Sequence, residues 1–389
     1  MADEPGEALH AEVGTLLATT GPRPSCSPAE RALGAALEAR WAGFCDEVRA
    51  EPFRCAPHAF LASVPLLAGV ALVATGLLAV WPAVASALAA GALGVLVVQL
   101  VRVRELLDPL FPQATGVNVV GVIRPSGEVR QRVILSAHQD SAWEFNVWWW
   151  FGRAGPVVNA VGLGAPLVTV VTGGLLAAGI EASAGIPLAW ALAPLVAIHL
   201  PFHTFRPVPG AMDDLAGIVS ISAAGRALAA ARPAHTEVVL LACAAEECGL
   251  RGAKRYAAAH RAAHAAVPTI DVNVDGVYDE AHLSAVTTEV STGVRHDGEL
   301  TALAAQVAGG LGLPLRRVAI PLGVTDATAF AQAGVRTLAL LAQDTRTLVP
   351  NYHTRLDTLD RVRPEALAAM RDVVVGVVRA LDGQGRHSP

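Results

Sequence analysis

Two long stretches of the sequence carry almost no charge, and they limit what the chain can fold into more than any other feature. Residues 59–101 contain no Asp, Glu, Lys or Arg, and residues 154–205 contain only Glu181. A helix needs about 20 apolar residues to cross a bilayer, so each stretch has room for two such helices. In the first stretch Trp81-Pro82 marks the turn, because proline ends one helix and tryptophan favours the lipid–water interface. We therefore predict two transmembrane helical hairpins.

The alternative for these stretches is a group of alanine-rich helices buried in a soluble protein. Their uninterrupted length argues against it, as does the composition of the whole chain. Of its 389 residues, 53% are hydrophobic and only 16% are charged, a balance typical of membrane proteins. The sequence thus predicts a multi-pass cell-membrane protein with four spans and the lipid bilayer as a partner.

Basic residues flank both stretches, whereas the turns inside them carry no Lys or Arg. The flanking residues are Arg40, Arg49, Arg54, Arg102, Arg104, Arg153 and Arg206. By the positive-inside rule, both hairpins enter from the cytoplasmic face and the rest of the chain is cytoplasmic. The five cysteines lack a CxxC pair, which fits a reducing compartment. A net charge of −5 gives no electrostatic reason to expect nucleic acid.

Outside the two stretches, strand and helix patterns alternate along the chain. The predicted strands are residues 117–123, 129–137, 236–244 and 269–274. The predicted helices are residues 213–232, 250–264 and 364–381. The turn Pro125-Ser126-Gly127 favours a hairpin between the first two strands. Alternation of this kind predicts an α/β fold with a mixed, mostly parallel sheet sandwiched by helices.

These patterns divide the chain into five predicted segments. They are an N-terminal helical segment (residues 1–58), the first hairpin (59–101), the first part of the α/β domain (102–153), the second hairpin (154–205) and the second part of the α/β domain (206–389).

Acidic and histidine side chains gather where the predicted strands end, which is where ligands bind in open α/β sheets. His138 and Asp140 follow one strand, the pair Glu246-Glu247 follows another, and Asp275 follows a third. Asp213 opens a helix, and His353 lies in a polar loop before the last helix. Taken singly, each has a structural explanation, such as a helix cap.

Taken together, these residues point to metal chemistry. Two neighbouring zinc ions need a bridging carboxylate and further nitrogen or oxygen ligands for each ion. A metal pair also relieves the repulsion between the adjacent carboxylates Glu246 and Glu247.

The motifs in order resemble those of the di-zinc aminopeptidase family, which includes bacterial leucyl aminopeptidases and glutamate carboxypeptidases. The matching stretches are His138-x-Asp140, Gly210-Ala-Met-Asp213-Asp214-Leu-Ala-Gly217, Glu246-Glu247-x-Gly249, Asp275-Gly276 and Tyr352-His353-Thr-x-x-Asp357. One departure is that about 75 residues, including the second hairpin, separate His138 from Asp213.

The resemblance implies a di-zinc exopeptidase-like fold with two zinc ions per chain. Asp213 would bridge the ions, with His138 and Asp275 completing one site and Glu247 and His353 the other. Three further residues would serve the reaction. Glu246 would be the general base, Asp140 would orient the His138 ring, and Tyr352 would steady the oxyanion.

The implied activity is that of a membrane-anchored metallopeptidase, an aminopeptidase acting on peptides or aminoacyl amides. Two alternatives stay open within the same scaffold: carboxypeptidase or deacylase action, and a non-catalytic membrane receptor or scaffold. A small transporter is a further alternative, although it has only the four spans in its favour.

Overall fold

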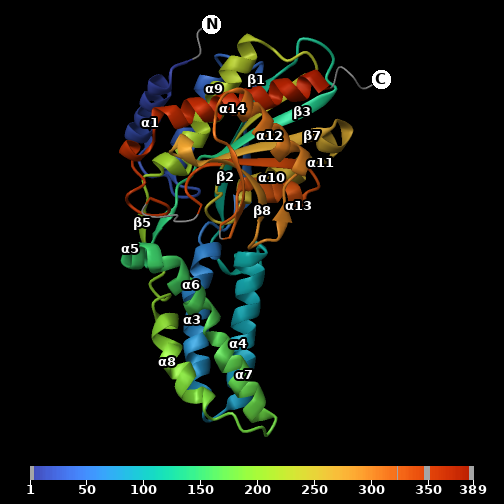
Figure 1. The fold of residues 1–389 in the computed structure, drawn as a ribbon. Helices are drawn as coiled ribbons and strands as arrows, with labels where there is room; N and C mark the ends of the chain where they lie inside the picture. Colours follow the sequence, from blue (N-terminus) through green and yellow to red (C-terminus); the bar gives the residue numbers. More distant parts are fainter. Residues whose placement is uncertain (1–3, 322, 346–350, 385–389) are drawn as a thin grey trace. The chain divides into compact units, whose positions relative to one another are not determined.

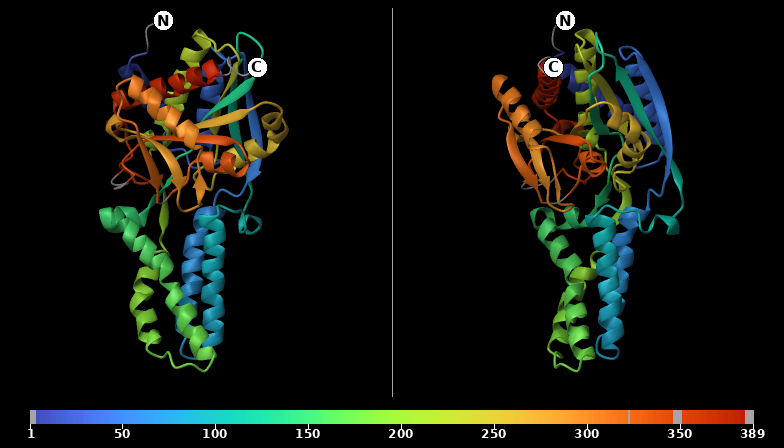
Figure 2. Two further views of the ribbon diagram at one scale, coloured as in Figure 1. Left: turned by 45° about the vertical axis from the view of Figure 1, so that its right-hand side comes forward. Right: turned by 90° about the vertical axis from the view of Figure 1, so that its right-hand side faces the viewer.

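The computed structural model of the protein describes residues 4–321, 323–345 and 351–384. The chain forms two compact units, and each is built from segments that are distant in sequence (Figures 1 and 2). The first unit comprises Met1–Cys55, Ala114–Ala142 and Pro207–Pro389. The second comprises Ala56–Gln113 and Trp143–Arg206.

A nine-stranded sheet forms the centre of the first unit, in the order β1-β2-β6-β3-β7-β11-β8-β10, with β9 beside β8. The strands are β1 (Glu47–Cys55), β2 (Ala114–Ile123), β3 (Gln131–His138), β6 (Thr236–Cys243), β7 (Thr269–Val277), β8 (Leu283–Glu289), β9 (Val294–Arg295), β10 (Arg316–Ile320) and β11 (Arg336–Ala342). The four central strands β6, β3, β7 and β11 run parallel to one another. The predicted α/β fold with a mixed, mostly parallel central sheet is confirmed.

Helices cover both faces of this sheet (Figure 2). One face packs against α1 (Gly6–Thr20), α2 (Pro28–Trp41), α9 (Ala216–Ala230), α12 (Gly298–Gly310) and α14 (Pro364–Gln384). The other packs against α10 (Arg251–Ala259) and α13 (Asp326–Gln332), with α11 (Arg261–Ala266) following α10. In β3, Val133, Leu135 and Ala137 enter the larger core, since side chains alternate along a strand.

Two local predictions were wrong. The segment Pro125-Ser126-Gly127 does not form a hairpin, because β6 lies between β2 and β3 in the sheet. Its backbone N–H groups instead bond the carbonyls of Pro233 and Ala234, just before β6. Residues 47–55, expected within an N-terminal helical segment, form β1 at the sheet edge. That position accommodates Pro52 within a strand.

The second unit consists mainly of apolar helices. They are α3 (Ala59–Leu77), α4 (Pro82–Leu96), α5 (Asn146–Phe151), α6 (Gly155–Gly164), α7 (Pro166–Ala177) and α8 (Gly185–Ala197). Two short strands, β4 (Trp143–Phe145) and β5 (His203–Pro207), pair with each other. The chain turns between α3 and α4 at Trp81-Pro82, as the sequence predicted.

Three helical stretches in the described chain are long and apolar enough to cross a membrane: Ala59–Leu77, Pro82–Val101 and Asn146–Ala177. The region predicted as a fourth span contains α8, which has 13 residues. At 1.5 Å per residue, α8 is about 20 Å long, against a hydrocarbon core of about 30 Å. The four spans of the prediction are therefore not confirmed.

Small residues bring the helices of the second unit close together. A Cβ on Gly173 of α7 would lie 2.5 Å from the Pro82 carbonyl oxygen of α4. Polar groups bond between helices at two places. The Thr75 and Thr169 hydroxyls are 3.1 Å apart, and Ser86 Oγ donates to the Val170 carbonyl at 2.8 Å. Close approach at glycine and buried hydroxyl bonds are typical of helices that pack within lipid.

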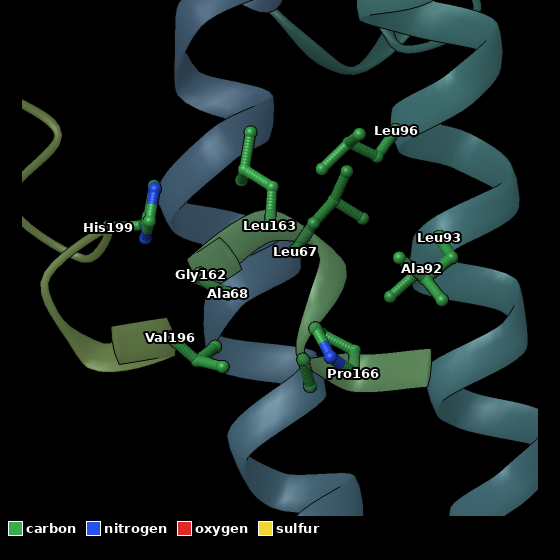
Figure 3. A pocket seen from close by; sticks show the side chains of 11 residues that line it. Leu67, Ala68, Ala92, Leu93, Leu96, Gly162, Leu163, Pro166, Val196 and His199 are labelled. Carbon is green, nitrogen blue, oxygen red and sulfur yellow. The ribbon is translucent and has the colours of Figure 1, made fainter. Parts of the chain in front are cut away.

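A small pocket lies among these helices (Figure 3). Apolar side chains such as Leu67, Leu93 and Val196 line it together with His199, and its volume is about 20 Å³. The His199 ring is held by the Leu195 carbonyl at 2.9 Å and by the Asn159 side chain at 3.1 Å. Because this volume suits roughly one water-sized group, we interpret the pocket as a packing gap and not as a ligand site.

Candidate metal centre

The candidate site lies at the carboxyl ends of three neighbouring parallel strands in the first unit. His138 is the last residue of β3, Asp275 lies near the end of β7, and Glu246 and Glu247 follow β6. The register pairs His138 with Cys243, so β3 and β6 end at the same level. Parallel strands bring side chains from strands as far apart in sequence as His138 and Asp275 to one sheet edge.

All five predicted metal ligands meet at this edge. Their ligand atoms form two groups, His138 with Asp213 and Asp275, and Asp213 with Glu247 and His353. Within each group the atoms lie within 4.8 Å of one another. A third group of the same kind joins His138 to Glu246 and Glu247.

Asp213 belongs to both ligand groups, and its two carboxylate oxygens face different imidazoles. Oδ1 is 2.9 Å from His138 Nε2, and Oδ2 is 3.3 Å from His353 Nε2. The same His353 nitrogen is 3.3 Å from Glu247 Oε2. This is the arrangement that a carboxylate bridging two cations requires.

Asp140 lies beside the His138 ring and also holds the glutamate loop. Its Oδ1 is 3.4 Å from His138 Nδ1, whose other near neighbour is the Asp140 carbonyl oxygen at 3.2 Å. The same carboxylate accepts the backbone N–H groups of Glu246 at 3.0 Å and Glu247 at 3.1 Å. One side chain therefore fixes both an imidazole and the backbone of two carboxylate residues. The sequence had suggested only the first of these contacts.

Two further carboxylates fix the backbone around Asp213. Asp357 accepts the N–H of Met212 at 2.7 Å and that of Asp213 at 3.2 Å. Asp214, joined to Asp213 by a cis peptide bond, accepts the N–H of His138 at 3.2 Å and that of Gly217 at 3.0 Å. The loop before α9 is thereby tied to the end of β3.

Tyr352 packs directly on His353, one of the predicted ligands. The two rings are stacked, with centroids 3.9 Å apart and an interplanar angle of 19°. Burial, followed by the charge of Asp213, raises the pKa of the Tyr352 phenol well above its usual range. The hydroxyl therefore stays protonated at neutral pH and is available as a hydrogen-bond donor.

The site concentrates negative charge in a place that water scarcely reaches. Burial raises the pKa of Glu246 and of Glu247 well above the usual range of a glutamate, and it raises the pKa of Asp275 to about 8. Burial also acts to raise the pKa of Asp213, but hydrogen bonds from His138 and His353 outweigh it, and the pKa is lowered. The positive charge of the two imidazoles is too small to balance the negative charge of these buried carboxylates.

A metal cation fits this donor set. The Glu247 Oε1 atom is buried and has no hydrogen-bond partner among the described residues. A buried carboxylate oxygen without a partner is costly unless a cation meets it. Two imidazoles and three carboxylates, with no thiolate among them, are ligands typical of catalytic zinc.

Comparison with known proteins finds one matching family. Residues 195–378 match the model of Peptidase family M28. The match includes Asp213, Glu246, Glu247, Asp275 and His353, whereas His138 and Asp140 lie before it. A search of curated proteins finds no match.

Solved structures with this fold include peptidases and a cyclase. An aminopeptidase from Aneurinibacillus sp. strain AM-1 has 15% identity and a TM-score of 0.59, with 96% of this chain and 93% of that one covered. A zinc aminopeptidase from Bacillus subtilis has 13% identity and a TM-score of 0.59, covering 97% and 95%. A glutaminyl cyclase from Fimbriiglobus ruber has 14% identity and a TM-score of 0.60, covering 97% and 96%.

The family match and the shared fold confirm the resemblance to the di-zinc aminopeptidase family. Residues 195–378 are thus similar to an M28 peptidase domain, and zinc is the metal that such a domain implies.

Sequence reasoning missed three residues that touch the site from the N-terminal part of the chain. They are Arg23, Ser25 and Glu30, which bond the loops that carry the ligands. No spacing signal could have revealed them, because each bonds a residue more than 100 positions away.

Proposed function

We propose that the protein is a membrane-anchored, zinc-dependent aminopeptidase that hydrolyses N-terminal peptide bonds at a site holding two zinc ions per chain. The observation that supports this most is the position of Asp213, whose two oxygens face His138 and His353 within the two ligand groups. In this proposal His138, Asp213 and Asp275 hold one ion, and Asp213, Glu247 and His353 hold the other. Bound zinc would supply Lewis-acid polarisation of the substrate carbonyl and a lower pKa for the attacking water.

Glu246 is the proposed general base. Its backbone is fixed by the bond from its N–H to Asp140, and burial raises the pKa of its carboxyl well above the usual range of a glutamate. A carboxylate whose pKa is raised is a stronger base than an ordinary glutamate, and it can return the proton later in the reaction. The Glu246 carboxylate accepts a proton from the attacking water and then donates it to the nitrogen of the leaving amine.

Asp140 and Tyr352 have supporting roles in this proposal. Asp140 holds the His138 ring in a fixed orientation through Nδ1, so that Nε2 faces the metal position. The Tyr352 hydroxyl, which remains protonated, donates a hydrogen bond to the oxygen on which negative charge develops.

The proposed membrane anchor is the second unit. Its three long apolar stretches match the thickness of a bilayer by length and composition, and its helices pack through small residues. The flanking arginines support a cytoplasmic location for the catalytic unit. Reporter fusions in the turn between α3 and α4 and at the C-terminus test this: the two fusions should report opposite sides of the membrane. Signals from the same side would refute the topology.

The enzyme assay uses the full chain purified in mild detergent. We expect zinc by metal analysis, hydrolysis of aminoacyl anilides, and loss of that activity with a chelator. Peptides with free and blocked N-termini separate an aminopeptidase from a carboxypeptidase or deacylase. A peptide with N-terminal glutamine is included because the fold also occurs in glutaminyl cyclases. Zinc binding without turnover of any substrate would favour a non-catalytic receptor.

A further inference from the structure

The segment between α1 and α2, together with the first turn of α2, bonds three of the loops around the candidate metal centre. We call Arg23, Ser25 and Glu30 the N-terminal clamp. Arg23 and Glu30 are fully buried, and none of the three lies within the residues that match the peptidase family. The clamp bonds three loops, those after β3, before α9 and after β6.

Arg23 joins the first two loops through backbone carbonyls. Its Nε donates to the Gln139 carbonyl at 2.9 Å, next to the ligand His138. Its Nη1 donates to the Pro209 carbonyl at 3.0 Å, and its Nη2 to the Gly210 carbonyl at 2.8 Å. Asp213 follows only three residues later. The planar guanidinium has several donors in fixed directions, which a lysine cannot reproduce.

Glu30 bonds the third loop directly, and Ser25 acts on it through Asp140. Ser25 Oγ donates to Asp140 Oδ2 at 2.6 Å, and Asp140 in turn holds the N–H groups of Glu246 and Glu247. Glu30 Oε1 accepts the N–H of Ala245 at 2.7 Å, directly before the glutamate pair. Its Oε2 accepts the N–H of Cys26 at 2.7 Å, which keeps the clamp itself in shape.

The clamp also places a positive charge behind the acidic site. Burial lowers the pKa of Arg23 to about 10, while the carboxylates of Asp357, Asp140, Asp214 and Glu30 act to raise it. The guanidinium is therefore cationic at neutral pH. It offsets part of the negative charge of the carboxylates that orient the ligands.

We propose that the N-terminal clamp positions the metal centre, so that His138, Asp213 and Glu247 are held ready to bind zinc. This inference rests on the proposed zinc site, since it concerns how that site is held. Residues behind metal ligands typically contribute about 10- to 100-fold in metal affinity, because the ligands must otherwise be ordered when the metal binds. Arg23, Ser25 and Glu30 are positioning residues and touch no substrate.

The first test compares arginines in the full-length protein in detergent. Arg23→Met removes the guanidinium donors, and Arg23→Lys keeps the charge without the planar geometry. Arg40→Met is the control, because Arg40 lies on α2 and pairs with Glu12 at 2.6 Å away from the ligand loops. Zinc affinity is measured by competition with a chromophoric chelator. We expect a loss of about 100-fold for Arg23→Met, a smaller loss for Arg23→Lys and none for Arg40→Met.

If Arg23→Met does not fold, a second pair of variants tests whether the clamp contributes to zinc affinity. Ser25→Ala removes the bond to Asp140, whereas Ser126→Ala removes a bond from Ser126 Oγ to the Pro233 carbonyl at 3.3 Å, before β6 and away from the ligand loops. We expect Ser25→Ala to lower zinc affinity about 10-fold, and to lower kcat without changing KM. Ser126→Ala should leave zinc affinity unchanged.

The outcomes separate the two proposals. If the wild-type protein binds no zinc, the proposed function is wrong and the inference that rests on it is overturned as well. If the wild type binds zinc and folded Arg23→Met and Ser25→Ala bind it equally tightly, the clamp alone is refuted.

Discussion

Replacing Glu246 by glutamine separates proton transfer from metal binding. The two side chains have nearly the same shape, and Glu246 is only 8% exposed, so the amide occupies the same space. The amide cannot accept the proton of the attacking water. A general base contributes about 10²- to 10⁴-fold to a rate. At 1.36 kcal/mol per factor of ten, this is about 2.7 to 5.4 kcal/mol of activation free energy. We expect kcat to fall by that factor.

The same variant should have the opposite effect on the stability of the metal-free protein. Burial raises the pKa of Glu246, so its ionised form opposes folding at neutral pH. A neutral amide removes that unfavourable term, and the thermal midpoint in the presence of chelator should rise. A fall in activity together with a rise in metal-free stability is not expected from a variant that merely damages the fold.

The assay measures kcat on an aminoacyl anilide, bound zinc by metal analysis, and thermal unfolding with chelator. Glu247→Gln is the matched control, since it changes the adjacent residue in the same way but removes a charged ligand. It should bind zinc less tightly, whereas Glu246→Gln should retain zinc. If Glu246→Gln with full zinc kept kcat within about threefold of the wild type, the assignment of Glu246 as the base would be refuted.

Three further predictions concern the metal centre. Asp213→Ala removes the proposed bridge and should lose both zinc ions; two ions per chain by metal analysis would contradict the bridging assignment. The pKa of Asp275 is raised to about 8 in the folded protein, from about 3.9 in the unfolded chain. Between these two pH values the folded metal-free protein therefore binds more protons than the unfolded chain. Its thermal midpoint with chelator should therefore fall as the pH rises from 5 to about 8, and a flat or rising midpoint would argue against this. Gly217→Ala places a Cβ 2.2 Å from Asp214 Oδ1, which should lower the free energy of unfolding by about 1 to 3 kcal/mol and weaken zinc binding. Gly309→Ala, with no atom within 4 Å of the new Cβ, should leave zinc binding intact; equal losses in both variants would refute the steric argument.

The site residues that follow strands could be predicted from the sequence, because the pattern that marks a strand end involves only neighbouring residues. A run of buried residues that ends in His138 or in Glu246-Glu247 marks the carboxyl end of a strand, and parallel strands end at one edge. For the same reason α9, β6, β7 and α14 were predicted within a few residues, whereas no element bounds were predicted between residues 275 and 363. Misplaced elements had weak or misleading local patterns. The charged edge strand β1 resembled helix, and the turn at Pro125-Ser126-Gly127 resembled a hairpin although β6 separates its flanking strands.

By itself, the sequence determined the α/β fold, the apolar stretches and the residue types that meet at the candidate metal centre, because hydrophobic periodicity and strand ends are properties of neighbouring residues. Only the tertiary structure decided that Asp140 holds the glutamate loop as well as an imidazole, and that Arg23, Ser25 and Glu30 support the site. These bonds join residues more than 100 positions apart. Their partners are fixed by the order of strands in the sheet, which no local pattern contains.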